Sequence, residues 1–239
     1  MGFTGAGAAW GNGSWATFPA AVMMGYDRVL FYQHNLAGDT FATTARQLTW
    51  NVANGYQLSV EWPPREPAMY DAAVGLQYLV LGALAADALR DYTAAGNLTR
   101  SRFAQHAVTA NWGPAPAVDP AAPAHTLAPD GFLLASPAAL AGLLTRFSGA
   151  DLAGPGAHLL VVRPDPWAAP HRQLWHLLGP ATNITAPAAA VLACTTPAPY
   201  RDAGGAGPAC TPHPSQPASA GHVTFVVPAN QSAAYYRLL

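Results

Sequence analysis

The pattern of the sequence changes near residue 102, and the change separates two parts that favour different fold classes. Before it, apolar runs of strand type alternate with longer segments of helical spacing, which is typical of an α/β unit with parallel strands. After it, short β-prone runs such as 157–164 and 222–228 are separated by Pro, Gly, Asp and Asn, which favours an antiparallel β-sandwich. We therefore predict two domains, residues 1–101 and residues 102–239.

The first part contains two runs that read as parallel strands, residues 28–33 and 56–62. A helix is expected over residues 41–55, and a second helix begins at Pro67 with apolar residues at helical spacing. Parallel sheets are covered by helices on both faces and normally need more than two strands. The first part is therefore predicted to be a piece of a larger α/β fold.

The segment 163–187, "RPDPWAAPHRQLWHLLGPATNITAP", does not fit the strand pattern of the rest of the second part. We expect it to be a loop with one helical turn.

The order of these elements resembles the end of a (β/α)8-barrel glycoside hydrolase that is followed by a C-terminal β-sandwich. The likeness covers roughly residues 16–145. It is carried by "RVLFYQHN" and "YQLSVEW" as late barrel strands, by the helix "PAMYDAAVGLQYLVLGALAADAL", and by "VTANWGPAPA" and "HTLAPDGFLL" as the start of the sandwich. The resemblance implies that most of the barrel belongs to a missing N-terminal part of the same chain, which would be a partner of this segment.

Barrel enzymes carry their chemistry at the C-terminal ends of the strands. On this resemblance Glu61 follows one strand and Asp39 lies in the loop after the other, so these two residues are the candidates for catalysis. Hydrolysis of a glycosidic bond needs two carboxyl groups. The resemblance implies a carbohydrate substrate, and the side chains placed to bind it are Gln33, His34, Asn35, Tyr56 and Trp62.

A structural role is the alternative at each of these positions. Glu61 is followed by two prolines and can be a solvated strand end. Asp39 can cap the helix that follows it, because an aspartate side chain accepts hydrogen bonds from the first free N–H groups of a helix. Tyr56 belongs to a strand and can be a core residue.

The two cysteines, Cys194 and Cys210, flank a segment rich in Pro, Gly and Ala. We expect a disulfide between them, with two free thiols as the alternative.

The histidines His158, His171 and His176 do not form a convincing zinc site, because His171 and His176 are five residues apart and do not share a helix face. No metal and no cofactor are predicted.

Charged residues make up only 10% of the chain, against about 25% in an ordinary soluble domain. Four sites fit the acceptor pattern for N-glycosylation, and attached glycans would supply the missing hydrophilic surface. The acceptor residues are Asn12, Asn97, Asn183 and Asn230. We therefore expect a secreted protein. The first 15 residues lack the basic and apolar regions of a signal peptide, so the chain is expected to be the C-terminal piece of a longer protein.

The net charge of −1 and the absence of an arginine cluster argue against nucleic-acid binding. The most apolar segment, residues 72–86, is too short to span a bilayer.

The leading hypothesis is the C-terminal part of a secreted, glycosidase-like protein that hydrolyses O-glycosidic bonds. The alternatives are a noncatalytic extracellular glycoprotein or carbohydrate-binding module, and a truncated product without activity.

Overall fold

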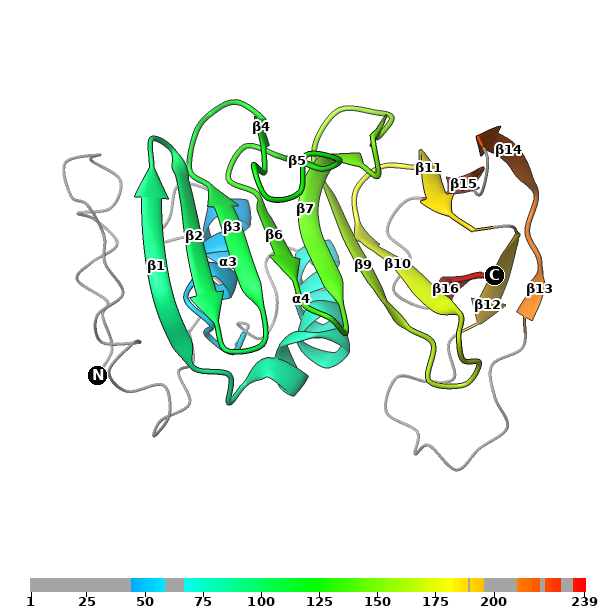
Figure 1. The fold of residues 1–239 in the computed structure, drawn as a ribbon. Helices are drawn as coiled ribbons and strands as arrows, with labels where there is room; N and C mark the ends of the chain where they lie inside the picture. The colour runs from blue at the N-terminus through cyan, green and yellow to red at the C-terminus, as the bar shows by residue number, and fades with distance from the viewer. Residues whose placement is uncertain (1–43, 59–66, 189, 196–209, 220–221, 229–233) are drawn as a thin grey trace.

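The computed structural model describes residues 44–58, 67–188, 190–195, 210–219, 222–228 and 234–239 (Figure 1). The helices of these described residues are α3 (Thr44–Ala53), α4 (Pro67–Leu79) and the short 3₁₀ helix η1 (Leu81–Leu84). The strands are β1 (Leu89–Ala95), β2 (Leu98–Phe103), β3 (Ala107–Asn111), β4 (Ala117–Val118), β5 (Thr126–Leu127), β6 (Phe132–Ala135), β7 (Leu140–Phe147), β8 (Ala150–Asp151), β9 (His158–Pro164), β10 (Arg172–Leu178), β11 (Thr182–Pro187), β12 (Val191–Thr195), β13 (Cys210–Pro212), β14 (Ser215–Ser219), β15 (His222–Val227) and β16 (Ala234–Leu238).

The strands form a large sheet and a small one. In the large sheet the hydrogen-bonded order is β1-β2-β3-β6-β7-β9-β10-β16-β12-β13, and β4, β5 and β8 pair with one another or with β7 beside this path. The small sheet has the order β11-β15-β14. Each strand pairing in the described part of the chain is antiparallel. The protein is therefore mostly β, with a large antiparallel sheet at its centre.

The middle of the large sheet, from β6 to β10, is buried on both faces. Successive side chains of a strand point to opposite faces. Along β9, Leu159 and Val161 belong to the core cluster that contains the helices, whereas Leu160 and Val162 belong to the cluster shared with the small sheet. The helices α3 and α4 lie behind the large sheet in Figure 1. The fold is thus a layer of helices, a central sheet and a small sheet, with a core on each side of the central sheet.

The helix α3 ends as its sequence predicts. Gly55 has φ 72°, its N–H donates to Val52 O at 3.1 Å, and the N–H of Tyr56 donates to Asn51 O at 2.8 Å. This pair of bonds is the Schellman motif, in which a glycine just beyond the helix takes a left-handed conformation.

The helix α4 lies very close to β10. Its buried residues Ala72, Leu76 and Leu79 recur at helical spacing and form the stripe that faces the sheet. A Cβ atom at Gly75 would lie 2.9 Å from the side chain of Leu177 in β10, so the glycine allows this close approach.

The predicted fragment of a (β/α)8 barrel is wrong. In the described residues the strand pairings are antiparallel, and both α-helices pack on one antiparallel sheet. Of the two expected parallel strands, residues 28–33 lie outside the described residues, and of residues 56–62 only 56–58 are described, with a single bridge at Gln57. The physical reason is that the buried residues of α3 and the apolar stripe of α4 pack on strands from residues 102–239.

The antiparallel β character predicted for residues 102–239 is confirmed. The predicted boundary at residue 102 falls inside β2 (Leu98–Phe103), and helices from before the boundary share a core with strands from after it. The prediction of a loop over residues 163–187 is wrong, because β10 and β11 occupy much of that segment. Its prolines lie at strand ends and in the connections, where a missing N–H is tolerated.

Candidate functional site

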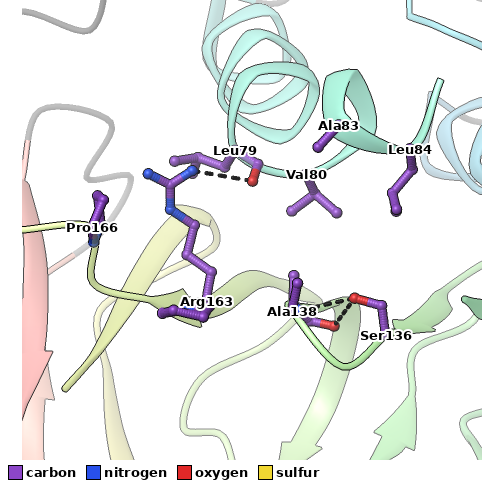
Figure 2. Close-up of a pocket in the computed structure, with 10 residues that line it drawn as sticks. Leu79, Val80, Ala83, Leu84, Ser136, Ala138, Arg163 and Pro166 are labelled. Atoms are coloured by element: carbon purple, nitrogen blue, oxygen red, sulfur yellow. Dashed lines mark hydrogen bonds between the residues drawn. The ribbon is translucent and has the colours of Figure 1, made fainter. Parts of the chain in front are cut away.

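A hollow of about 290 Å³ lies where the end of α4 and η1 meet the large sheet (Figure 2). We call it the Arg163 hollow. Its lining includes Leu79, Val80 and Leu84 on the helical side and Ser136, Arg163 and Pro166 on the sheet side. The hydroxyl of Ser136 is already engaged, since it donates to Ala139 O at 3.1 Å and accepts from Ala139 N at 2.8 Å. The walls are thus mainly aliphatic, with a guanidinium group at one side.

Arg163 extends from the end of β9 toward the last turn of α4, as Figure 2 shows. Its Nε donates to Gln173 Oε1 at 3.0 Å and its Nη1 donates to the backbone oxygen of Leu79 at 3.3 Å. Both acceptors are neutral. Burial lowers the pKa of Arg163, against smaller electrostatic effects of nearby groups that raise it. The guanidinium is held in place by two neutral acceptors rather than by a carboxylate.

Asp165 lies two residues further along but has other partners. Its Oδ2 accepts from Arg237 Nε at 2.5 Å, and its Oδ1 accepts from the backbone N–H of Trp167 at 2.9 Å. The Nε2 of Gln173 also lies 3.3 Å from Oδ1. Because the carboxylate is buried, it needs these hydrogen bonds and a paired cation. Asp165 therefore neutralises Arg237 and organises the β9–β10 loop.

Trp167 is exposed beside these charged groups. Its side chain is 41% exposed, and its ring stacks on Tyr235 with centroids 6.2 Å apart. Tyr235 in turn stacks on Trp175, at 5.1 Å, and both of these rings are buried. The stack fixes the orientation of Trp167 and leaves part of its surface to solvent. A fixed, exposed aromatic ring offers a flat apolar surface to a ligand.

A pair of buried histidines lies at the other end of the β9–β10 hairpin. His158 Nδ1 is 3.2 Å from His176 Nε2, and His176 Nδ1 is 2.9 Å from the backbone oxygen of Pro228. A Cβ at Gly179 would lie 2.7 Å from His158 Nδ1, so glycine is needed where the chain passes the pair. No group of three or more His, Cys, Asp or Glu side chains in the described ranges is arranged to hold a metal ion.

Asp87 and His106 form a second buried polar pair. His106 Nδ1 lies 2.5 Å from Asp87 Oδ2, and the ring of His106 stacks on Phe103 with centroids 4.0 Å apart. The backbone N–H of Gln105 also donates to the carboxylate, at 2.9 Å. Burial lowers the pKa of His106, and the hydrogen bond to Asp87 opposes this. The pair joins the connection before β1 to the turn between β2 and β3.

Most of the residues predicted for the site lie outside the described part of the chain. Those outside are Asn12, Gln33, His34, Asn35, Asp39, Glu61, Trp62 and Asn230. Their predicted roles in catalysis, sugar binding and glycosylation stay predictions.

Three residues predicted for the site are described. Tyr56, predicted to bind substrate, is 8% exposed and packs edge-on against Trp50 with ring centroids 4.7 Å apart, so the structure gives it a packing role. Asn97, in the turn between β1 and β2, and Asn183, in β11, are both exposed. Both acceptor asparagines are therefore accessible in the folded protein.

The predicted disulfide is confirmed. Cys194 in β12 and Cys210 in β13 are bonded, and the two residues are direct partners across the pair of strands. The loop between the strands lies outside the described residues, and the bond closes it.

As for membranes, the helices of the described residues are all too short or too polar to serve as a membrane span.

The sequence reasoning did not find Arg163, Asp165 or Trp167 as site residues. Residues 163–187 were predicted to be a loop with one helical turn, whereas these three residues lie at the turn of the β9–β10 hairpin. A usable signal was present in "RPDPW", which places a cation, an anion and an aromatic ring within five positions at the end of the apolar run 158–162.

Comparison of the chain with protein-family models, with curated protein sequences and with solved structures found no match in any of the three.

Proposed function

We propose that this chain is a carbohydrate-binding module of a secreted glycoprotein, and that Trp167 with the adjacent Arg163 hollow is its binding site. The observation that carries the proposal is the exposed ring of Trp167, held flat by the buried rings of Tyr235 and Trp175. Sugar rings have apolar C–H faces that pack on aromatic rings, and their hydroxyls need a few polar partners nearby. Arg163 is such a partner.

Hydrogen bonds made by the neighbours of Trp167 hold the β9–β10 loop in one conformation, so the proposed site is rigid. The backbone N–H of Trp167 is bound by Asp165, whose other oxygen is bound by Arg237 from β16. The β9–β10 loop is also closed by hydrogen bonds between Asp165 N and His171 O and between His171 N and Ala168 O, each 2.9 Å long. A site that is ordered before binding loses less entropy when the ligand arrives.

A secretory location is part of the proposal. The disulfide between Cys194 and Cys210 favours an oxidising compartment, and Asn97 and Asn183 are exposed acceptors. Hydrolysis by Glu61 and Asp39 stays a separate prediction, because both residues lie outside the described ranges. Loss of hydrolysis by the parent protein on Glu61→Gln, with binding retained, would favour the enzyme over the binding module.

The experiment that tests the function is a glycan array probed with the full chain, followed by calorimetry on the glycans that bind. Trp167→Ala is expected to weaken binding by at least about tenfold, because large aromatic side chains commonly dominate binding sites. Val118→Ala is the matched control, since Val118 is also an exposed apolar side chain but lies on β4. Equal affinities for the wild type and Trp167→Ala would remove Trp167 from the site, and an empty array would refute the function.

Glycosylation at Asn97 and Asn183 gives an independent prediction. After expression in a eukaryotic secretory host, Asn97→Gln and Asn183→Gln are each expected to lower the mass of the protein by one glycan, because both side chains are exposed. Mass spectrometry before and after enzymatic deglycosylation measures this. Thr185→Ser is the control, because it keeps the acceptor pattern at Asn183. An unmodified wild type at both sites would contradict the prediction.

A further inference from the structure

Arg163 has hydrogen-bonding capacity that the fold does not use. A guanidinium group carries five N–H donors, and in Arg163 the described acceptors are Gln173 Oε1 for Nε and Leu79 O for Nη1. In the described part of the structure the Nη2 atom has no acceptor. Figure 2 shows one terminal nitrogen of Arg163 directed at Leu79 and the other directed away from it, on the side of Pro166. The unused N–H donors of Arg163 thus lie on the side of the hollow that Pro166 lines (Figure 2).

The described part of the structure shows no ion pair between Arg163 and a carboxylate, although the nearby Asp165 attracts its charge. Gln173 is the cross-strand neighbour of both Arg163 and Arg237, so these residues form one row across β9, β10 and β16. The carboxylate of Asp165 binds to this row, where it forms an ion pair of 2.5 Å with Arg237. Two cations and one anion leave an excess of positive charge at Arg163. A partly buried cation that shares one carboxylate with a second cation is not fully neutralised, so an anion that enters the hollow is stabilised there.

The shape and lining of the hollow restrict the anion further. The remaining walls are aliphatic, with Leu79, Val80 and Leu84 opposite Pro166. A small inorganic anion would leave this apolar surface in contact with water. An anionic group on a body with apolar C–H faces would cover it, and Trp167 directly follows Pro166, which lines the hollow. A carboxylate matches the two parallel N–H groups of an arginine fork.

We infer that the Arg163 hollow binds the carboxylate of a uronic acid, so that the module selects acidic over neutral glycans. The inference rests on the proposed function, because it assigns the ligand class of the same site. In the bound state the carboxylate accepts hydrogen bonds from the guanidinium of Arg163, and the C–H face of the sugar lies on the aliphatic wall and near Trp167.

The test is a calorimetric titration of the full chain with a galacturonic acid trimer and with a galactose trimer of the same linkage. The wild type is expected to bind the acidic trimer at least about tenfold more tightly, with a preference that falls as salt is added. Arg163→Gln is expected to lower the affinity for the acidic trimer to about that for the neutral trimer, which removes the preference. Arg102→Gln is the matched control, because Arg102 is exposed on β2, and it is expected to keep the preference.

The outcomes separate this inference from the proposed function. Equal binding of both trimers by the wild type, lost on Trp167→Ala, would overturn the inference and leave the function standing. A preference retained in Arg163→Gln would also overturn it. Binding of neither trimer and of no other glycan would remove both. A sulfated galactose trimer bound as tightly as the uronic acid would show that any anion suffices, which contradicts the assignment of a carboxylate.

Arg163→Gln removes a cation that also binds Leu79 O and Gln173, so its folding has to be checked by thermal unfolding. The comparison of the two trimers on the wild type does not depend on any variant. Arg163→Lys gives a second test if Arg163→Gln does not fold. It keeps the charge but not the fork, so the preference for the acidic trimer is expected to fall by several fold without disappearing.

Discussion

Replacement of Gly131 by alanine is expected to destabilise the protein by about 4 kcal/mol or more, close to the whole stability of many domains. A Cβ at this position would lie 2.4 Å from the backbone oxygen of Leu143 and 2.8 Å from both the N and O atoms of Ala128. These are backbone atoms, which cannot move aside as the end of a flexible side chain can. Overpacking of this kind forces the backbone to shift.

The atoms around Gly131 are tied to one another. The N–H of Gly131 donates to Ala128 O at 3.0 Å, and the N–H of Ala128 donates to Leu143 O at 3.1 Å. Asn111 joins the same group, because its backbone N–H donates to Gly131 O and its Nδ2 donates to Ala128 O. A shift that relieved the overlap would therefore break several buried hydrogen bonds between β3, β6 and β7.

Gly149→Ala is the matched control for Gly131→Ala. Gly149 has φ +83°, but a Cβ there would meet no atom within 4 Å, so its cost is the conformational strain of about 1–2 kcal/mol. Urea denaturation monitored by tryptophan fluorescence gives the free energy of unfolding of each variant. Equal losses in the two variants would show that steric overlap at Gly131 is not the cause.

The sequence predicted the β part of the fold for physical reasons that hold locally. Short β-prone runs bounded by Pro, Gly, Asp and Asn mark strands and turns without any knowledge of their partners. "HTLAPDGFLL" was assigned to the start of the sandwich, and its Gly131 lies in the crowded turn before β6. The disulfide was predictable for a similar reason, since two cysteines in an oxidising setting leave a single pairing.

The α/β interpretation of the first part failed because an apolar stripe does not specify the surface that it will cover. The residues Ala72, Leu76 and Leu79 of α4 fit the outside of a barrel as well as the face of an antiparallel sheet. The direction of strand pairing is set by long-range contacts, and helical spacing in the sequence carries no information about it.

The candidate site was missed because its parts are far apart in the sequence. Asp165 and Arg237 are separated by 72 residues and meet only because β16 pairs with β10. In addition, β10 is buried on both faces, so "RQLWHLL" lacks the alternation of apolar and polar residues that marks a half-buried strand. With β10 unrecognised, Trp167 could not be assigned to a hairpin loop or stacked on Tyr235.

The buried pair of His158 and His176 is expected to make the protein much less stable in acid. The backbone oxygen of Pro228 can only accept, so His176 Nδ1 carries the hydrogen in the contact of 2.9 Å. In neutral His176 the Nε2 atom is then an acceptor, and His158 Nδ1 donates to it at 3.2 Å. The remaining Nε2 of His158 is buried without a described partner, and a proton added there places a charge on a side chain that is 0% exposed.

Burial, together with repulsion from His176, lowers the pKa of His158 from 6.5 to about 4, against a smaller effect of the Ala153 backbone that raises it. Because the folded pKa is the lower one, the unfolded chain binds this proton more readily at any pH between the two values. The stabilisation is therefore complete above pH 6.5 and is lost as the pH falls toward 4. At 1.36 kcal/mol per pKa unit, the loss over this window is about 3 kcal/mol.

Urea denaturation at a series of pH values between 4 and 7 measures this loss as a fall in the free energy of unfolding. His158→Gln keeps a donor near His176 Nε2 but cannot take up the proton, so its stability is expected to fall much less steeply than that of the wild type. His171→Gln is the control, since His171 is partly exposed in the β9–β10 loop and should leave the slope unchanged. Parallel pH profiles for the wild type and His158→Gln would mean that acid acts at other groups, such as His106 and His125, whose pKa burial also lowers.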